Sequence, residues 1–387
     1  MVNDSKDKNN PPWQSENNNL PKEEDLQTLR KEIDQIDKQI LELLKRRAKV
    51  AKKIGEIKRS KGLKIYIPER EKEIIDKLLK ENNKEFPEEA LKTIFLEIFS
   101  ACRSLQEPLK VGYLGPEASF THQAALEQFG SSTSFIPLPT IGDIFEEVER
   151  ENIDYGVVPV ENTIEGVVNY TLDMFLEKPN IKIVGEIVIP VAQHLMSLSD
   201  ELSKIKKVYS HPHALAQVRN WLDKYLPHAE RIEVESTAKA AQLAKEDEQA
   251  AAVASKVAAR VYNLQILKKN IQDRTDNYTR FLVIGKDKTS SEAEQTPPKR
   301  GFRYKTSVLF AVEDEAGALY RALEPFYRHK VNLTKIESRP SKEKSWDYVF
   351  FIDLDGHVLE ENVKKALQEL KERTKMVRIL GTYPKEV

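Results

Sequence analysis

The stretch LELLKRRAKVAKKIGEIK, residues 41–58, belongs to a run in which apolar residues recur at alternating spacings of three and four. The apolar positions of this repeat are Leu26, Leu29, Ile33, Ile36, Ile40, Leu43, Val50, Ile54 and Ile57. The repeat predicts one long amphipathic helix from Glu23 to about Arg59, about 50 Å in length at about 1.5 Å per residue. Such a helix is longer than a small domain needs, so we expect it to pair with a second copy of the chain.

Arg47 stands where the next apolar residue of this repeat should fall. Three explanations are open: the side chain reaches solvent from a shallow groove, pairs with a buried carboxylate, or points into a cavity that holds an anionic ligand. Lys58 follows about three helical turns later, so the two cations share one face of the helix. Arg30 adds a third cation, and in a dimer built on this helix it would approach Arg47 of the other subunit.

Two shorter helices are predicted after a turn near Gly62. One runs from Pro68 to about Asn82 and the other from Pro87 to about Gln106, each with a proline at its start. Together with the long helix they form an all-α domain over residues 22–107. Two short helices cannot cover the whole apolar face of the long one, which again favours a dimer.

Composition limits the class of protein. The chain has 387 residues, 40% of them hydrophobic and 32% charged, which is typical of several globular domains. With 61 Lys and Arg against 62 Asp and Glu, its net charge of -1 gives no reason to expect nucleic acid as a partner. The single cysteine, Cys102, excludes an intrachain disulfide framework. No apolar run is long enough to span a membrane, and residues 1–21 are expected to be a disordered extension, so we expect a cytoplasmic protein without a membrane partner.

From Leu109 to about residue 285, short β-rich runs alternate with helical patterns, which predicts an α/β domain. We expect two lobes with a cleft between them, like a periplasmic binding protein: lobe 1 from residues 110–190 plus 270–285, and lobe 2 from residues 191–269. In lobe 2 one helix is predicted from Ala214 to Tyr225 and another that continues to about Leu267.

The C-terminal part follows a polar linker at residues 286–304. Its periodicities predict strand, helix, strand, strand, helix, strand over residues 305–387. This βαββαβ order is the ferredoxin-like α+β motif.

Several familiar motifs are missing from the α/β domain. The turn GYLGPEASF at residues 112–120 is not a dinucleotide fingerprint, and no GxSxG elbow is present. The seven histidines show no metal-ligand spacing. We therefore expect neither a cofactor nor a metal.

Polar clusters instead follow the predicted strands, where ligands bind in open α/β sheets. They are Pro159–Thr163, Ser210–Pro212 with Gln217, Ser236–Ala238, and Asp276–Phe281. Helix N-capping is the alternative explanation, and it suits Ser236 or Thr237 well. It suits Thr279 and Arg280 poorly, because these residues enter a strand.

The helical domain resembles the all-helical chorismate mutase domain, whose members form intertwined dimers through the long first helix. The resemblance rests on the run from Leu29 to Lys58, on IPEREKEI (67–74) and on IFSACRSLQ (98–106). It implies that Arg47 and the partner subunit's Arg30 hold the two carboxylates of chorismate. It also implies the remaining site residues, namely Lys58 and Gln106 at the ether oxygen, Glu71 at the ring hydroxyl, Arg70 in support and Cys102 among the substrate contacts.

Two positions depart from this family pattern. Ile67 stands where Asp commonly precedes Pro-Glu-Arg, and Cys102 stands where Ser is common. The rearrangement of chorismate to prephenate is pericyclic and needs no nucleophile. The protein therefore acts by fixing the reactive conformer and stabilising charge on the ether oxygen.

The α/β domain resembles prephenate dehydratase over about residues 110–285. The motifs are GPEASFTHQAAL, VPVENTIEGVV followed by TLD, SHPHALAQ, STAKAA and NYTRF. The implied reaction converts prephenate to phenylpyruvate, carbon dioxide and water without a cofactor. We expect Thr279 as proton donor or hydrogen-bond catalyst and Arg280 as carboxylate anchor. Orientation of the ring and its hydroxyl is expected from Asn162, Thr163, Ser210 and Gln217.

AGALYRALEPF (316–326) and KIESRPSK (335–342) resemble the GAL and ESRP segments of the ACT regulatory domain, in which phenylalanine binds between paired subunits. Backbone amides near Gly317, Ala318 and Leu319 would receive the ligand's carboxylate, and Glu337 would balance its ammonium group. Ser338, Arg339 and Pro340 complete the second segment. A purely structural ferredoxin-like domain is the alternative.

The combined prediction is a bifunctional enzyme of phenylalanine biosynthesis, at least dimeric, that takes chorismate and prephenate and is inhibited by L-phenylalanine. Two alternatives stay open. One is a monofunctional prephenate dehydratase with a degenerate, dimerising mutase domain. The other is a non-catalytic amino-acid sensor.

Overall fold

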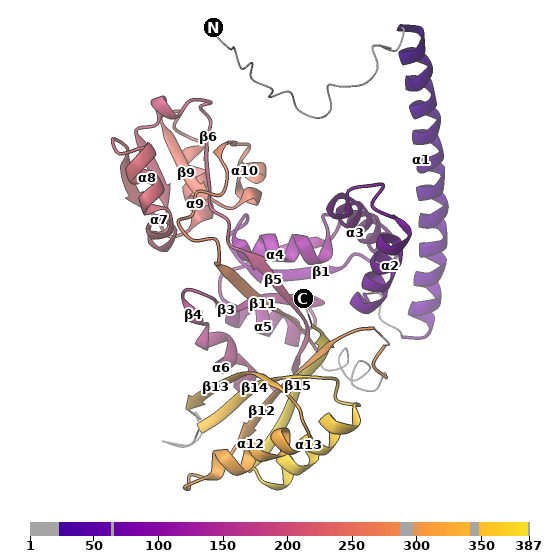
Figure 1. Cartoon of the computed structure of the whole chain (residues 1–387), viewed down its shortest axis with the longest axis vertical. Helices are drawn as coiled ribbons and strands as arrows, with labels where there is room; N and C mark the ends of the chain where they lie inside the picture. Colours follow the sequence, from indigo (N-terminus) through magenta and orange to yellow (C-terminus); the bar gives the residue numbers. More distant parts are fainter. Residues whose placement is uncertain (1–22, 63–65, 287–296, 300, 341–347, 386–387) are drawn as a thin grey trace, which may run out of the picture.

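The computed structural model describes residues 23–62, 66–286, 297–299, 301–340 and 348–385 (Figure 1). The predicted extension at residues 1–21 lies outside this part of the chain, as does most of the predicted linker. Three units follow one another: a helical unit, a two-lobed α/β unit and a C-terminal sheet covered by two helices.

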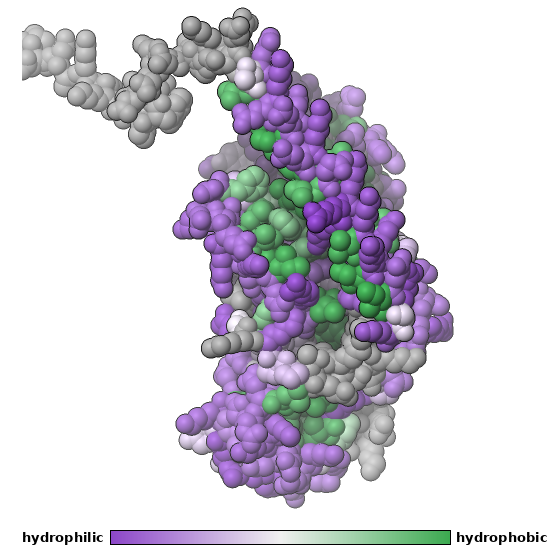
Figure 2. Space-filling model, turned by 90° about the vertical axis from the view of Figure 1, so that its right-hand side faces the viewer, coloured by the Kyte–Doolittle hydropathy of each residue, from purple (hydrophilic) through white to green (hydrophobic). Residues whose placement is uncertain are grey.

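The helical unit consists of α1 (Glu23–Ser60), α2 (Pro68–Glu81) and α3 (Glu88–Ser104). α1 stands along one side of the molecule, and its C-terminal half contacts α3 (Figure 1). The predicted apolar face of α1 is solvent-exposed in the single chain, and green apolar patches run along this side in Figure 2. The large exposed side chains of α1 are Leu26, Leu29, Ile33, Ile36, Ile40, Leu41, Leu43, Leu44, Val50, Ile54 and Ile57.

Lobe 1 is built on a sheet with the strand order β2-β1-β3-β11-β5, and β4 pairs with β3. Its strands are β1 (Lys110–Leu114), β2 (Ser134–Leu138), β3 (Tyr155–Asn162), β4 (Gly166–Val167), β5 (Ile181–Pro190) and β11 (Tyr278–Lys286). Its helices are α4 (Phe120–Phe129), α5 (Ile141–Glu149) and α6 (Asn169–Glu177). The late strand β11 lies between β3 and β5 and is antiparallel to both, so it brings residues from the end of the α/β unit into the middle of this sheet.

Lobe 2 has a second sheet, with the order β10-β6-β9-β7-β8. Its strands are β6 (His194–Ser197), β7 (Lys207–Ser210), β8 (Glu230–Glu233), β9 (Ala250–Ala254) and β10 (Gln265–Lys268). Its helices are η1 (Leu202–Lys204), α7 (Pro212–Gln217), α8 (Arg219–Tyr225), α9 (Thr237–Ala244) and α10 (Lys256–Tyr262).

Two helix predictions in lobe 2 were wrong. The helix expected over 214–225 is broken at Val218, whose ψ of 12° leaves the helical range and separates α7 from α8. The helix expected to reach Leu267 ends at Tyr262, because Asn263 takes the left-handed conformation with φ of 55°. The chain then pairs with β6 as strand β10.

The C-terminal unit contains β12 (Tyr304–Ala311), α12 (Ala318–Arg328), β13 (Leu333–Pro340), β14 (Tyr348–Asp355), α13 (Glu361–Glu372) and β15 (Met376–Pro384). Its sheet has the order β13-β14-β12-β15. This is the βαββαβ motif. The predicted fold class, a helical unit followed by a two-lobed α/β unit and a ferredoxin-like unit, is therefore confirmed.

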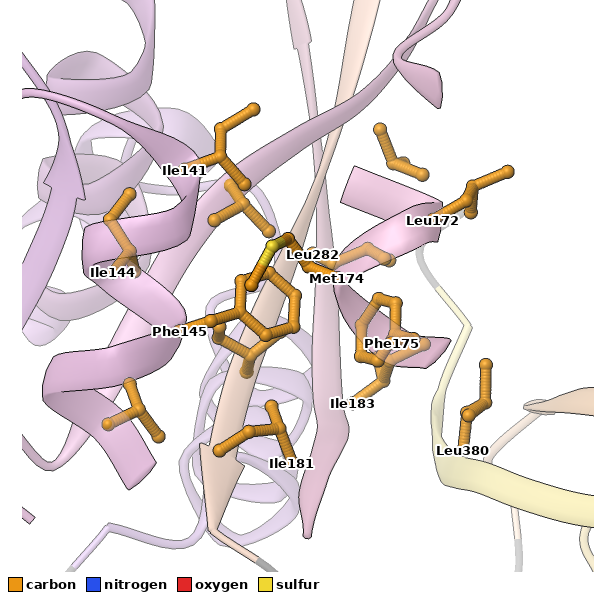
Figure 3. Close-up of a cluster of buried hydrophobic side chains, with 14 of the residues drawn as sticks. Ile141, Ile144, Phe145, Leu172, Met174, Phe175, Ile181, Ile183, Leu282 and Leu380 are labelled. Atoms are coloured by element: carbon orange, nitrogen blue, oxygen red, sulfur yellow. The ribbon is translucent and has the colours of Figure 1, made fainter. Parts of the chain in front are cut away.

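The core of lobe 1 continues into the C-terminal unit. Figure 3 shows Phe145 of α5 and Phe175 of α6 packed among residues of β5 and β11, with Leu380 of β15 at the edge of the same cluster. A Cβ atom on Gly381 would overlap the carbonyl oxygen of Ile183, so only glycine allows β15 to lie this close to β5. The two units thus share one hydrophobic core.

Candidate active sites

The helical unit gathers charged side chains from all three of its helices. The guanidinium of Arg47 lies over the ring of Phe99 in α3, with 5.2 Å between its central carbon and the ring centroid. Glu71, in the first turn of α2, is largely buried. Burial raises the pKa of its carboxyl group, whereas Arg103, Arg47 and Lys58 each act to lower it. Burial disfavours the charged form of Lys58 as well, which lowers its pKa, whereas the nearby Glu71 carboxylate acts to raise it.

Gln106 joins this group from the end of α3. Its side chain packs against α1, since a Cβ on Gly55 would come within 2.8 Å of the Gln106 Cβ. Its Nε2 donates to the carbonyl oxygen of Cys102 at 3.3 Å, while its Oε1 is one of the few buried side-chain atoms without a hydrogen-bond partner in the described part of the chain. A buried polar atom without a partner is rare and marks a place where a ligand group can bind. The thiol of Cys102 is itself buried.

Two predicted residues lie apart from this group. Arg30 is exposed on α1, roughly 25 Å along the helix axis from Arg47. Arg70 is exposed at the start of α2, where its Nη1 donates to Glu73 at 3.0 Å. A single chain therefore brings together Arg47, Lys58, Glu71 and Gln106 but not Arg30.

A second polar group lies in lobe 1 where β3 ends beside the start of the antiparallel strand β11. The Asn162 Oδ1 accepts hydrogen bonds from the backbone of Ile164 and Glu165 at 2.9 and 3.0 Å, which fixes the orientation of its amide. The Nδ2 then donates to the hydroxyl of Thr279 at 2.8 Å. Because the Thr279 oxygen accepts this bond, its own hydrogen can be directed to a substrate.

Asn277 completes the same group, although it was not among the predicted site residues. It is 3% exposed, and its Oδ1 accepts from Asn162 at 2.8 Å. Its Nδ2 is buried without a hydrogen-bond partner among the described residues. Thr163 fastens the strand ends, donating to the Asp276 carbonyl at 2.9 Å and accepting from the Tyr278 amide at 3.0 Å. The sequence signal for Asn277 was its place beside Thr279 in NYTRF.

The second lobe approaches this group through a contact between a histidine and a carboxylate. The Nδ1 of His213 in α7 lies 2.7 Å from the carboxylate of Glu165, which follows β3. Ser210 and Gln217 flank this contact but have structural partners. The fully buried Ser210 hydroxyl donates to the Val253 carbonyl at 2.7 Å. Gln217 accepts from Gln193 at 3.2 Å. The predicted role of Ser210 in orienting the substrate stays a prediction: its hydroxyl hydrogen bonds to the neighbouring strand, which leaves its oxygen as an acceptor.

The predicted role of Arg280 as a carboxylate anchor stays a prediction, and its contacts in the single chain are with other protein side chains. Consecutive residues of a strand point to opposite faces, so Thr279 and Arg280 diverge. The Arg280 guanidinium donates to Glu186 of β5 at 2.8 Å and to Asp353 of β14 at 2.6 Å. Lys305 of β12 also donates to Glu186, at 2.6 Å. These four side chains, here called the interface tetrad, are almost fully buried between lobe 1 and the C-terminal sheet, so the charge of Arg280 is already balanced by protein carboxylates.

Further contacts surround the interface tetrad. Tyr383 bonds with both Ser307 and Arg280, at 2.7 and 3.1 Å. Lys335 donates to Glu161 at 2.8 Å across the same interface. The cavity left beside Arg280 is only about 20 Å³.

The predicted ligand-binding segments of the C-terminal unit lie on different faces of its sheet. Gly317, with φ of 81°, precedes α12, and a 320 Å³ pocket lies beside Ala318. The amide of Ala318 already donates to the Glu315 carbonyl at 3.2 Å, which corrects its expected availability. Leu319 packs against the core beneath α12. β13 pairs with β14 so that Glu337 lies on the face opposite the helices.

Arg339, a predicted member of the phenylalanine site, has a protein partner in the single chain. It forms a two-pronged ion pair with Asp173 of α6, at 2.8 and 2.9 Å, and so joins the C-terminal unit to lobe 1. Ser338 and Pro340 are exposed on β13. Gly317 and Glu337 therefore do not form one site within a single chain, and a ligand between them requires a second copy.

The described residues form neither a metal site nor a membrane-spanning helix. Within the described ranges, no group of three or more His, Cys, Asp or Glu side chains is placed to hold a metal ion. None of the described helices has the length and apolar character required to cross a membrane.

Three family models match the chain in succession. Chorismate mutase type II matches residues 29–107, prephenate dehydratase matches residues 111–289 and the ACT domain matches residues 306–372. The folds and the two polar groups thus define an enzyme with two active sites and an added regulatory-type domain.

Full-length relatives carry the same combination. A bifunctional chorismate mutase/prephenate dehydratase of Aquifex aeolicus is 60% identical over 94% of this chain and 98% of its own length. One of Pseudomonas aeruginosa is 39% identical over 94% and 99%. The chain belongs to the family of bifunctional chorismate mutase/prephenate dehydratases. The prediction of an enzyme with both activities is confirmed, and both alternatives, the monofunctional enzyme and the sensor, are disfavoured.

A solved structure supports the arrangement of the last two units. The prephenate dehydratase of Arthrobacter aurescens, described in complex with L-Phe, is 33% identical, with a TM-score of 0.64 over 72% of this chain and 90% of that one.

Proposed function

We propose that the helical unit rearranges chorismate through Arg47, Lys58, Glu71 and Gln106, supplemented by Arg30 of the partner subunit. The observation that carries this assignment is the convergence of Arg47, Lys58 and Glu71 from two helices on one partly buried place. A pericyclic reaction is accelerated by holding the reactive conformer and by stabilising charge that builds up in the transition state. Lys58 and the second hydrogen of the Gln106 Nε2 donate to the ether oxygen, and Glu71 accepts from the ring hydroxyl.

We propose that the dehydratase site lies where β3 ends and β11 begins. Thr279 donates a hydrogen bond to the departing hydroxyl group, and Asn162 holds the Thr279 oxygen in place. The unpartnered Nδ2 of Asn277 supplies a second donor. Thr163 holds the two strand ends together, and Gln217 faces the site from lobe 2. Departure of hydroxide and carbon dioxide aromatises the ring, so hydrogen bonding suffices where a strong acid is lacking.

We infer that L-phenylalanine is the regulatory ligand and that it binds between the ACT domains of paired chains. Two observations support this proposal: the pocket beside Ala318, and the placement of Gly317 and Glu337 on opposite faces of one sheet. The Arthrobacter aurescens relative was obtained with L-Phe. We also infer a dimer built on the apolar face of α1, and a cytoplasmic location, for which the single cysteine is the support.

The test is an assay of the whole chain that records prephenate and phenylpyruvate separately, with and without phenylalanine. Lys58→Met should abolish prephenate formation from chorismate while leaving the conversion of supplied prephenate intact. Thr279→Val should do the reverse, so that prephenate accumulates, and Thr279→Ser should recover much of the lost rate. Lys53→Met, on the exposed side of α1, is the matched control. Unchanged phenylpyruvate production by Thr279→Val would contradict the dehydratase assignment.

A further inference from the structure

Arg103 is a buried cation that touches both the mutase and the dehydratase units. It lies near the end of α3 with 4% of its side chain exposed. Its Nη1 donates to the carboxylate of Glu71. Its Nη2 donates to the carbonyl oxygen of Phe129, the last residue of α4 in lobe 1, at 2.5 Å. One guanidinium therefore connects a proposed mutase residue to the backbone of the dehydratase unit.

Tyr66 forms a second connection at the same place. Its ring lies 4.9 Å from that of Phe129 and 5.5 Å from that of Tyr155, both in lobe 1, measured between centroids. Its hydroxyl accepts from the Gln128 Nε2 at 2.6 Å. The Arg103 guanidinium also covers the Tyr66 ring, at 5.1 Å. Because Tyr66 directly precedes the first turn of α2, the segment that carries Glu71 is held by lobe 1 at its start.

We propose that the dehydratase unit forms the supporting wall of the mutase site, and that Arg103 is the positioning residue that transmits this support to Glu71. The proposal rests on the proposed role of Glu71 at the substrate's ring hydroxyl. A planar guanidinium can hold two oxygens in fixed directions at once, which a lysine ammonium on a flexible stem does not do. With one nitrogen fixed on a helix-terminal carbonyl, Arg103 determines where the Glu71 carboxylate lies.

The charges around Glu71 set the direction of the expected effect. Arg47 and Lys58 face it from α1, Arg103 faces it from α3, and Tyr66 lies on the segment before α2. Burial raises the pKa of Glu71, and the three cations counteract burial. Removal of Arg103 therefore raises this pKa further. As the pH falls, Glu71 then becomes protonated at a higher pH than in the wild type, and the carboxylate that accepts from the ring hydroxyl is lost.

The experiment compares full-length Arg103→Met, Arg103→Lys and Glu97→Gln. Glu97 is the matched control, because it lies on the same helix and binds Ser131 of lobe 1, at 2.5 Å to its hydroxyl, without contacting Glu71. For each variant, kcat and KM of the mutase are measured against pH, and dehydration of supplied prephenate is measured as a check of folding. Each substitution is repeated in a Glu71→Gln background.

In Arg103→Met we expect the acidic limb of mutase kcat/KM to move up by about one pH unit, with kcat reduced about tenfold or more. Arg103→Lys, which keeps the charge, should return the limb toward its original pH. Glu97→Gln should follow the wild type, and in the Glu71→Gln background Arg103→Met should have little further effect. Dehydratase activity should be retained throughout.

The proposal is overturned if Arg103→Met and Glu97→Gln give the same mutase profile, or if both Arg103 variants lose the two activities in equal proportion. Full mutase activity in Glu71→Gln alone would instead refute the proposed role of Glu71, and the proposal about Arg103 with it. A loss in Glu71→Gln without any effect of Arg103→Met would refute only the role of Arg103.

Discussion

Asp353 and Asp355 offer a sharp test of the interface between lobe 1 and the ACT domain. Both lie on β14, two positions apart, and both are ion-paired. Asp353 is 9% exposed and accepts from Arg280 at 2.6 Å and from Ser307 at 2.5 Å. Asp355 is 34% exposed and pairs with Lys385 at 2.6 Å. The same substitution to asparagine therefore removes a buried charge in one case and a half-exposed charge in the other.

The expected magnitudes differ accordingly. In Asp353→Asn, Arg280 and Lys305 remain buried with only Glu186 to balance them, and breaking a buried pair costs about 3–5 kcal/mol. For a half-exposed pair such as that of Asp355 the cost is about 0–1 kcal/mol. Because lobe 1 and the ACT domain share one core, the melting unit is larger than the ACT domain alone, and one kcal/mol shifts the melting temperature of a unit of about 150–250 residues by about 2–4 °C. We thus expect the transition of this joined unit to fall by about 6 °C or more in Asp353→Asn and by about 0–4 °C in Asp355→Asn.

Scanning calorimetry of the full-length chain measures both shifts. The mutase assay serves as an internal control, because the ion pairs described for the interface tetrad join lobe 1 to the ACT domain, so the helical unit should keep its activity at 25 °C. Equal shifts for the two variants would refute the reasoning, since they would mean that burial of the tetrad contributes nothing to docking.

Three further predictions follow from the sites and the exposed face of α1. Mutase activity of the wild type should decline at alkaline pH, because the neutral Lys58 amine loses its charge-assisted hydrogen bond. The decline should begin at a lower pH than the pKa of an ordinary lysine predicts, because burial lowers the pKa of Lys58. A pH-rate profile without this alkaline limb would contradict the assignment. The double variant Ile36→Glu/Ile40→Glu should sediment as a smaller species in analytical ultracentrifugation and should lose mutase activity. Arg30→Ala should also reduce mutase activity. An unchanged sedimentation coefficient of the double variant would exclude α1 as the interface. Glu337→Ala should raise the phenylalanine concentration needed for half-maximal inhibition, by about 5-fold or more, and equal sensitivity would remove Glu337 from the ligand site.

The parts of the fold that were predictable from the sequence are those with a strong local period. The three-four spacing along α1 and the βαββαβ order depend on short stretches, so both could be read directly. The break at Val218 and the end of α10 at Asn263 depend on single backbone conformations that periodicity does not reveal.

Residue roles at the boundaries between units were harder to predict. That Thr279 and Arg280 point to opposite faces follows from strand geometry, but the sequence does not show that Asp353 of the ACT domain meets Arg280 on its face. Arg103 likewise resembled an ordinary helix residue, although a charge within the apolar pattern of α3 was a signal. Its partners Glu71 and Phe129 come from two different units, and that proximity exists only in the folded chain.

Strand β11 has a mechanical consequence for inhibition. It is hydrogen bonded along both edges, to β3 and to β5, so it is as stiff as the sheet around it. A force applied by the ACT domain at Arg280 cannot displace Thr279 alone and must turn lobe 1 as one body. The motion available is then a change in the spacing of the two lobes, which would stretch the contact between Glu165 and His213. An inhibitor acting through such a motion would change the rates at which prephenate binds and dissociates. It would change the hydrogen bonds around Thr279 less.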